Sequence, residues 1–253
     1  MKTHSIIRVV LAFVLSVIFT LVSFTLVHAY IEPCLSRGIT LTRSDVITTT
    51  GSGGHSLAGG TISCHTAFTE YTEKSSFAGF GFNTNNTAQG IFVGTGLGKR
   101  GSSLELVLTM ADVSEFSDFL FSAAYQFLGE TATRPAMAVG IDAINEIPDQ
   151  METSPYIVTS KYFPIRRLPV VASLGWGSGR FQDSFFGDLA FILGRQWSFI
   201  VEYDGLGGNV GLSFGSELSL WRPFPVVVIL GFQNAFASDE ESVLSIGAGI
   251  RFH

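Results

Sequence analysis

Residues 211–215 read Gly-Leu-Ser-Phe-Gly and match the Gly-x-Ser-x-Gly pattern around the nucleophile of many serine hydrolases. In those enzymes the serine lies on a sharp turn between a strand and a helix, which exposes its hydroxyl group. Here apolar residues alternate with small ones across the motif, and no helical pattern follows it. We therefore expect Ser213 to lie in mid-strand and point to the polar face, so a hydrolase is only the second alternative function.

Two other patterns that can carry chemistry are incomplete. The glycine-rich stretch at 94–99 ends in Lys99 but lacks the spacing and the helix of a phosphate-binding loop. His55, His65 and His253 do not have the spacing of metal ligands. The sequence therefore predicts no cofactor, no metal site and no enzymatic activity.

Isolated charged residues interrupt segments that are otherwise apolar or small. Charges inside a membrane protein tend to face water or each other, so we expect these side chains to point inward. They would line either a polar channel or a plugged lumen with structural ion pairs, and a barrel of about twelve strands can fill much of its own interior. The lumen-lining candidates are Glu105, Asp118, Asp142, Lys161, Asp188, Glu202, Asp204 and Arg251.

The elements that must position these residues are strands. Residues 242–253 alternate apolar side chains with small or polar ones and carry an aromatic residue, Phe252, near their end. Successive side chains of a strand point to opposite faces, so one face of this segment is wholly apolar. The same alternation recurs from residue 89 onward, in segments of about the 9–11 residues that a tilted strand needs to cross a bilayer.

The composition fits membrane strands better than a water-exposed sheet. The chain is 46% hydrophobic and only 14% charged, whereas soluble proteins carry about 25% charged residues. No long apolar run follows residue 29, so the apolar surface must be spread over many strands. The sequence therefore predicts an all-β fold, a transmembrane antiparallel up-and-down β-barrel of the bacterial outer membrane. Its expected partners are membrane lipid and the barrel assembly machinery, and its net charge of −6 argues against nucleic acid.

The predicted barrel occupies residues 61–253. Eleven strands are expected from residue 89 onward, and bacterial single-chain barrels have an even number. One more strand is therefore expected at 61–71 or 77–82, which gives twelve strands, with ten or fourteen as alternatives. Residues 30–60 are polar and weakly patterned, which predicts a periplasmic lead-in or a partial plug.

Residues 1–29 have the features of a secretory signal peptide. A basic start is followed by an apolar run and by a cleavage site after Ala29. The alternative is a retained membrane anchor, because the apolar run approaches the length of a spanning helix. Export to an oxidising compartment predicts a disulfide between Cys34 and Cys64, with two unpaired thiols as the alternative.

The connections and the aromatic residues predict an orientation in the membrane. Short basic turns alternate with longer acidic ones, and aromatic residues fall near both ends of the strands. As a set they predict two belts at headgroup depth, although each alone also fits ordinary packing. This interpretation turns Val158 outward together with the tyrosines at 156 and 162. The belt candidates are Phe127, Tyr156, Tyr162, Trp176, Trp197, Tyr203, Trp221 and Phe252.

Three stretches, at 134–141, 154–161 and 201–205, read Arg-Pro-Ala-Met-Ala-Val-Gly-Ile, Ser-Pro-Tyr-Ile-Val-Thr-Ser-Lys and Val-Glu-Tyr-Asp-Gly. Over residues 90–253 the chain resembles the YjbH group of Gram-negative outer-membrane barrels, which is linked to exopolysaccharide production. The resemblance implies an envelope location and polysaccharide export components as partners. The predicted function is a non-enzymatic barrel that assists export of envelope polysaccharide or passage of another solute. The first alternative is a structural barrel without a channel that acts through its surface loops.

Overall fold

The computed structural model describes most of the predicted barrel. The predicted signal peptide at 1–29 and lead-in at 30–60 lie outside the described residues, and so do Cys34 and Trp221. The described residues are 64–68, 76–83, 89–99, 101–112, 117–145, 152–163, 165, 168–193, 196–219, 223–236 and 242–252.

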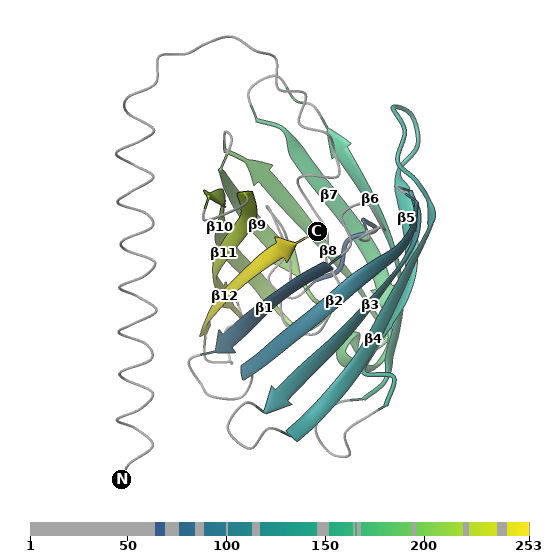
Figure 1. Ribbon diagram of the computed structural model, residues 1–253. Coiled ribbons are helices and arrows are strands. Elements are labelled where there is room, and N and C mark those ends of the chain that lie inside the picture. The colour runs from purple at the N-terminus through teal and green to yellow at the C-terminus, as the bar shows by residue number, and fades with distance from the viewer. Residues whose placement is uncertain are drawn as a thin grey trace. The chain divides into compact units, whose positions relative to one another are not determined.

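Twelve antiparallel strands close into a barrel (Figure 1). A short 3-10 helix, η3 (Gly179–Phe181), lies between β7 and β8. Within the described residues, no helix is long and apolar enough to cross a membrane. The strands are β1 (Ser76–Asn83), β2 (Gln89–Lys99), β3 (Ser102–Asp112), β4 (Ser117–Leu128), β5 (Ala136–Asp142), β6 (Ser154–Phe163), β7 (Val170–Gly177), β8 (Ser184–Ile192), β9 (Trp197–Tyr203), β10 (Gly208–Ser219), β11 (Pro223–Gln233) and β12 (Val243–Phe252).

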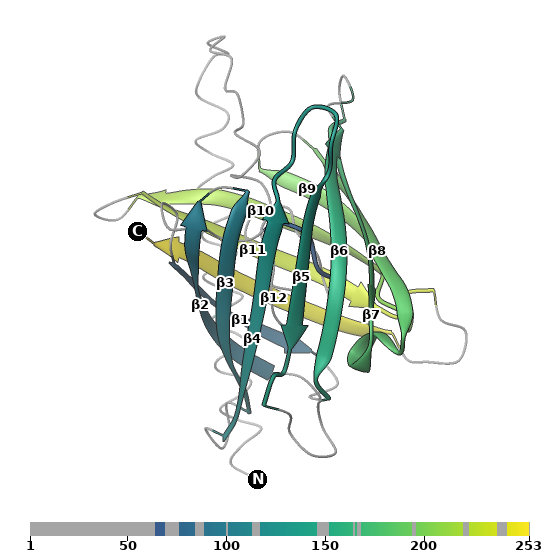
Figure 2. The ribbon, with the colours of Figure 1, turned by 90° about the vertical axis from the view of Figure 1, so that its right-hand side faces the viewer.

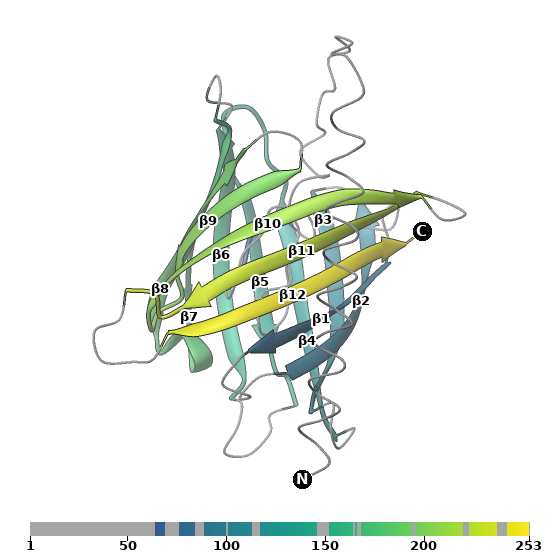
Figure 3. The ribbon, with the colours of Figure 1, turned by 90° about the vertical axis from the view of Figure 1, so that its left-hand side faces the viewer.

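The connectivity is up-and-down, because each strand pairs with its neighbours in the sequence and β1 pairs with β12. The closing pair runs from Ser76 opposite Phe252 to Asn83 opposite Ser245. Views from two sides show the strands wrapping round a common interior (Figures 2 and 3). The predicted twelve-strand antiparallel barrel is confirmed, and its first strand comes from the candidate at 77–82.

Each strand alternates between an inward row, which is largely buried, and an outward row, which is largely apolar and exposed. Leu212 is 42% exposed, whereas the next residue, Ser213, is 1% exposed. In β3, Leu106 is exposed and Glu105 is buried. The faces predicted for β3, β4, β8, β9 and β10 are confirmed wherever the structure describes the side chains.

The prediction for β6 was wrong, because Tyr156 and Val158 lie on its inward row and are buried. A shift of one residue turns every side chain of a strand to the opposite face. Both rows of β6 carry apolar residues, so hydropathy alone does not choose between them. The pairing with β5 places Tyr156 opposite Gly140, where the absence of a side chain leaves room for the tyrosine ring.

Aromatic rings lie over glycines of neighbouring strands inside the barrel. A Cβ atom added to any of these glycines would collide with the ring, so the rings fill the space that the glycines leave. This packing fixes which residues oppose one another and occupies part of the lumen. The ring and glycine pairs are Phe77 with Gly94, Phe92 with Gly79, Tyr156 with Gly140, and Phe186 with Gly175.

We predict that Gly140→Ala destabilises the barrel by about 1–3 kcal/mol, because the added methyl group overlaps the Tyr156 ring. In a double variant with Tyr156→Ala this cost should disappear, since the clashing ring is gone. Urea unfolding of the folded barrel measures both effects. As a control, Val158→Ala removes the next inward side chain of β6, which faces Ala138, and its cost should simply add to that of Gly140→Ala. Additive costs in both cycles would contradict the packing described.

Candidate functional site

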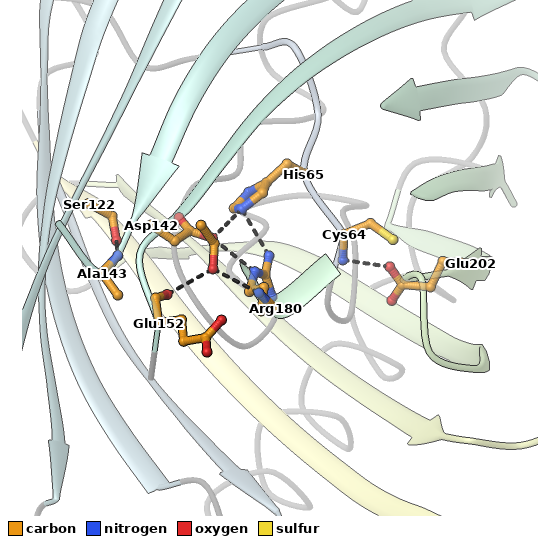
Figure 4. A network of polar contacts seen from close by, with 9 residues as sticks. Cys64, His65, Ser122, Asp142, Ala143, Glu152, Arg180 and Glu202 are labelled. Carbon is orange, nitrogen blue, oxygen red and sulfur yellow. Dashed lines mark hydrogen bonds and ion pairs between the residues drawn. The ribbon is translucent and has the colours of Figure 1, made fainter. Parts of the chain in front are cut away.

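Residues 64–68, here called the plug segment, lie inside the barrel. Cys64, His65, Thr66 and Ala67 are each at most 2% exposed. They contact strand residues from β5, β6, β8 and β9 and the loop that contains η3, as the close-up view shows for Cys64 and His65 (Figure 4). Part of the range predicted as a strand, 61–71, is therefore a lumen-filling segment. Its described apolar residues do not alternate, and two of its amide groups hydrogen-bond to side chains of the wall.

Two backbone amides of the plug segment are bound by the wall. The Cys64 N–H donates to Glu202 Oε2 at 2.9 Å, and the Ala67 N–H donates to Ser160 Oγ at 2.7 Å. The Cys64 thiol donates to the carbonyl oxygen of Tyr203 at 3.2 Å. These contacts satisfy backbone groups that burial would otherwise leave without a partner. Cys34 lies outside the described residues, so its disulfide with Cys64 stays a prediction.

The wall residues that bind these amides belong to one continuous row, here called the polar stripe. Each of its residues lies directly opposite the next in the register of β6 to β10, and all are at most 7% exposed. Ser160 Oγ also donates to Ser173 Oγ at 2.9 Å. The stripe therefore provides a ladder of polar groups against which the plug segment docks. Its residues are Ser160, Ser173, Asp188, Glu202 and Asn209.

His65 has the most specific contacts of the plug segment. Its Nε2 lies 2.7 Å from Asp142 Oδ2, at the end of β5, and 2.9 Å from Arg180 Nη2, in η3. Arg180 Nε lies 2.9 Å from the same carboxylate oxygen. One ring nitrogen cannot both donate to Asp142 and accept from Arg180. The shorter contact favours donation to Asp142, which makes His65 a neutral donor to a carboxylate that Arg180 also holds.

Aromatic rings enclose the imidazole. His65 stacks on Tyr156 with ring centroids 4.1 Å apart and an interplanar angle of 11°. The edges of Phe181 and Phe186 complete the enclosure, with centroids at 5.8 and 6.4 Å. The inward position of Tyr156 thus serves the plug segment, and the tyrosine forms no part of an outer aromatic belt.

Burial sets the charge of the plug segment. It lowers the pKa of His65, with Arg180 adding to the effect and Asp142 opposing it. It also raises the pKa of the Cys64 thiol, and the carboxylates of Glu202 and Asp188 raise it further. At neutral pH both side chains are therefore uncharged. A protonated, buried thiol is a poor nucleophile, and the contacts of Cys64 within the described residues serve docking.

Four of the predicted lumen residues are inward and buried: Glu105, Asp142, Asp188 and Glu202. Their inward position agrees with the predicted faces, and a role in lining a channel stays a prediction. Asp118 and Arg251 lie on strands, but their side chains are outside the described set.

Asp204 and Lys161 differ from the other lumen candidates in their positions. Asp204 lies in the turn after β9, where its carboxylate accepts from the amides of Leu206 and Gly207 at 3.0 and 2.9 Å. It also accepts from the side-chain amide of Asn209, in the polar stripe, at 2.9 Å, so it connects the turn to the lumen wall. Lys161 lies on the outward row of β6, because that strand faces the opposite way to the prediction. Its Nζ lies 3.3 Å from a carboxylate oxygen of Glu130, in the turn between β4 and β5.

The aromatic candidates divide between the two faces. Tyr162 is half-buried on the inward row of β6 and packs against buried apolar residues, so its belt assignment was wrong in the same way as that of Tyr156. The side chain of Phe252 is outside the described set. Four candidates point outward and are exposed: Phe127, Trp176, Trp197 and Tyr203. Their place in a belt at headgroup depth stays a prediction.

The serine of the hydrolase-like motif is buried in the middle of β10. Its Oγ lies 2.7 Å from Ser198 Oγ on the neighbouring strand, a contact between two hydroxyl groups without a base. Among the described residues, no group of three or more His, Cys, Asp or Glu side chains is arranged to hold a metal ion.

A scan against protein-family models found no match, and a search of the curated proteins found none that matches either. The likeness to the YjbH group stays a prediction.

Sequence reasoning did not identify the plug contacts. His65 has no metal-ligand spacing and Arg180 belongs to no motif, so neither residue stands out in the sequence. The sequence contains one indirect indication of the plug segment. Cys64 and His65 are adjacent at a point before β1 where apolar and polar residues stop alternating. Nothing local indicates that their partners lie on β5, η3 and β9.

We predict that acid releases the plug segment. Because the docked state lowers the pKa of His65, docking is strongest above the ordinary histidine pKa of about 6.5 and weakens as the pH falls below it, by on the order of tenfold per unit. Asp142, Arg180 and Tyr156 are the titratable groups around the ring. The rate of maleimide labelling at Cys64, in a Cys34→Ser background, measures the release.

His65→Gln provides the control, since glutamine cannot gain a proton. The ratio of labelling rates between the histidine protein and this variant cancels the intrinsic pH dependence of the thiol. We expect the ratio to rise as the pH falls from 8 to 5. A ratio that stays constant would show that His65 protonation does not control docking.

Proposed function

We propose that the chain is a non-enzymatic outer-membrane β-barrel protein whose lumen is blocked by the plug segment. A polar solute passes through the lumen when this segment moves aside. The observation that carries the proposal is the position of residues 64–68 inside a closed barrel, bound by side chains and not by strand pairing. Breaking the side-chain contacts between the plug segment and the wall breaks no pairing between strands. The plug segment can therefore leave the lumen while the sheet stays intact.

The outward rows support a membrane location. Large apolar side chains stand exposed on almost every strand, including Phe121, Leu174, Phe185 and Leu230 at 43–64% exposure. A contiguous apolar surface of this kind exceeds what soluble proteins usually expose to water. A closed barrel also leaves no unpaired sheet edge, which hydrocarbon surroundings require. The predicted signal peptide fits export to the outer membrane.

The wall behind the plug segment supports solute passage. Once residues 64–68 leave, the polar stripe faces the lumen with hydroxyl, amide and carboxylate groups. Ser160, Ser173 and Asn209 offer hydrogen bonds of the kind that sugars and other hydrated solutes make. Envelope polysaccharide is the solute that the resemblance to the YjbH group suggests.

A structural barrel without a channel is the second candidate. The observation that favours it is an apolar cluster on the inward rows, which belongs to the wall and would remain after the plug segment left. Such a barrel would act through its loops. The cluster consists of Phe77, Phe92, Val107, Val171, Ala190, Ile192, Ile200, Val227 and Ile229.

We predict that Leu212→Arg costs about 2–4 kcal/mol of folding free energy in lipid vesicles, because a charge near the bilayer midplane loses its hydration. Leu206→Arg, in the turn between β9 and β10, is the matched control and should cost little, although Leu206 is exposed to a similar degree, 54% against 42%. Urea unfolding from vesicles measures both. Equal costs at the two positions would contradict lipid contact along β10.

We also predict that replacing residues 64–68 by a glycine-serine segment of the same length opens the lumen. The unchanged protein should be closed in planar bilayers, and the replaced protein should conduct ions. Slower or faster gel migration of unboiled samples, relative to boiled ones, shows that the barrel is folded. A folded but non-conducting replacement would favour the structural barrel.

A further inference from the structure

We infer that the lumen uncovered by the plug segment selects for cations, because the wall behind this segment carries paired carboxylates. This inference rests on the proposed function, since it concerns the solutes that the opened barrel passes. It assigns the selectivity to Asp188 and Glu202, at the centre of the polar stripe.

The wall is acidic. Its buried inward carboxylates come from four strands, β3, β5, β8 and β9, and belong to Glu105, Asp142, Asp188 and Glu202. Among strand residues with described side chains, the basic ones, Lys99 and Lys161, lie on outward rows. Arg180 reaches the interior from η3, where Asp142 binds it. The described wall thus carries more negative than positive charge.

Asp188 and Glu202 are direct cross-strand neighbours on the inward faces of β8 and β9. Opposed residues in such a pair have Cβ atoms about 4.5–5.5 Å apart, so two negative charges there repel each other. Asp188 is 4% exposed, and its Oδ1 has no hydrogen-bond partner. A buried carboxylate oxygen without a donor is poorly stabilised in the closed state.

The plug segment covers this pair. The Cys64 amide donates to Glu202 (Figure 4). The Cys64 thiol lies against the backbone of β8 and β9, at the carbonyl groups of Gly187 and Tyr203. When the segment leaves, water and cations reach both carboxylates and relieve their repulsion. Rings of acidic side chains select cations in membrane pores by the same attraction. Departure of the plug segment therefore allows cations to bind the two carboxylates, and bound cations in turn stabilise the open lumen.

The test uses the full chain with residues 64–68 replaced by glycine and serine. Its reversal potential in a KCl gradient across a planar bilayer gives the ratio of potassium to chloride permeability. We expect a ratio well above one. Asp188→Asn and Glu202→Gln, which keep the shape of each side chain, should lower the ratio, and together they should bring it close to one.

Asp183→Asn is the matched control. It removes the same charge from an exposed position in the loop between β7 and β8, at a φ of 51° that asparagine also adopts. The ratio should not change in this variant. Should the replaced segment prevent folding, His65→Ala in the native chain loosens the plug segment at one residue and permits the same measurement.

The outcomes separate the two proposals. Two results would overturn the cation assignment but not solute passage. One is conduction with a potassium-to-chloride permeability ratio near one, and the other is a high ratio that Asp188→Asn and Glu202→Gln together do not lower. An equal loss of selectivity in Asp183→Asn assigns the effect to net charge and also overturns the inference. A folded protein that never conducts overturns the proposed function and the inference with it.

Discussion

Closure of the sheet between β1 and β12 is the constraint on which the rest of the structure depends. Once the barrel is closed, every strand has a partner on both sides and each residue faces either inward or outward. The outward rows can then be uniformly apolar, because no edge needs polar protection. The inward rows must be filled by their own side chains or by another segment. Both solutions are present, as rings packed over glycines and as a stretch of chain docked on polar residues.

The architecture could be predicted because alternation is a local signal. In β3 and β9, one row is apolar or aromatic throughout, whereas the other row contains serine and glutamate, so the sequence alone distinguishes the two faces. The number of strands followed from parity, since eleven strands were visible and bacterial single-chain barrels have an even number. β6 shows the limit of this reasoning. Tyr156 and Val158 lie on one row of this strand and Ile157 and Phe163 on the other, so both rows are apolar. The inward row is identified by Gly140 on β5, which leaves room for the Tyr156 ring.

The plug segment could not be predicted, for a related physical reason. It has no regular hydrogen-bond ladder and therefore no periodicity to detect. Its contacts are also far away in the sequence: Cys64 and Glu202 are 138 residues apart. What the sequence does contain is a set of charged residues in otherwise apolar or small segments. Those charges predicted a polar interior, whereas the three-dimensional arrangement shows which of the acids the plug segment contacts.

The central claim is that residues 64–68 lie inside the barrel. The most direct measurement is nuclear magnetic resonance of the protein in lipid nanodiscs, with cross-peaks recorded between the ring protons of His65 and Tyr156. Stacked rings with centroids 4.1 Å apart should give strong cross-peaks, and a water-soluble paramagnetic agent should leave the His65 signals sharp. Absent cross-peaks, together with His65 signals broadened by that agent, would contradict the account.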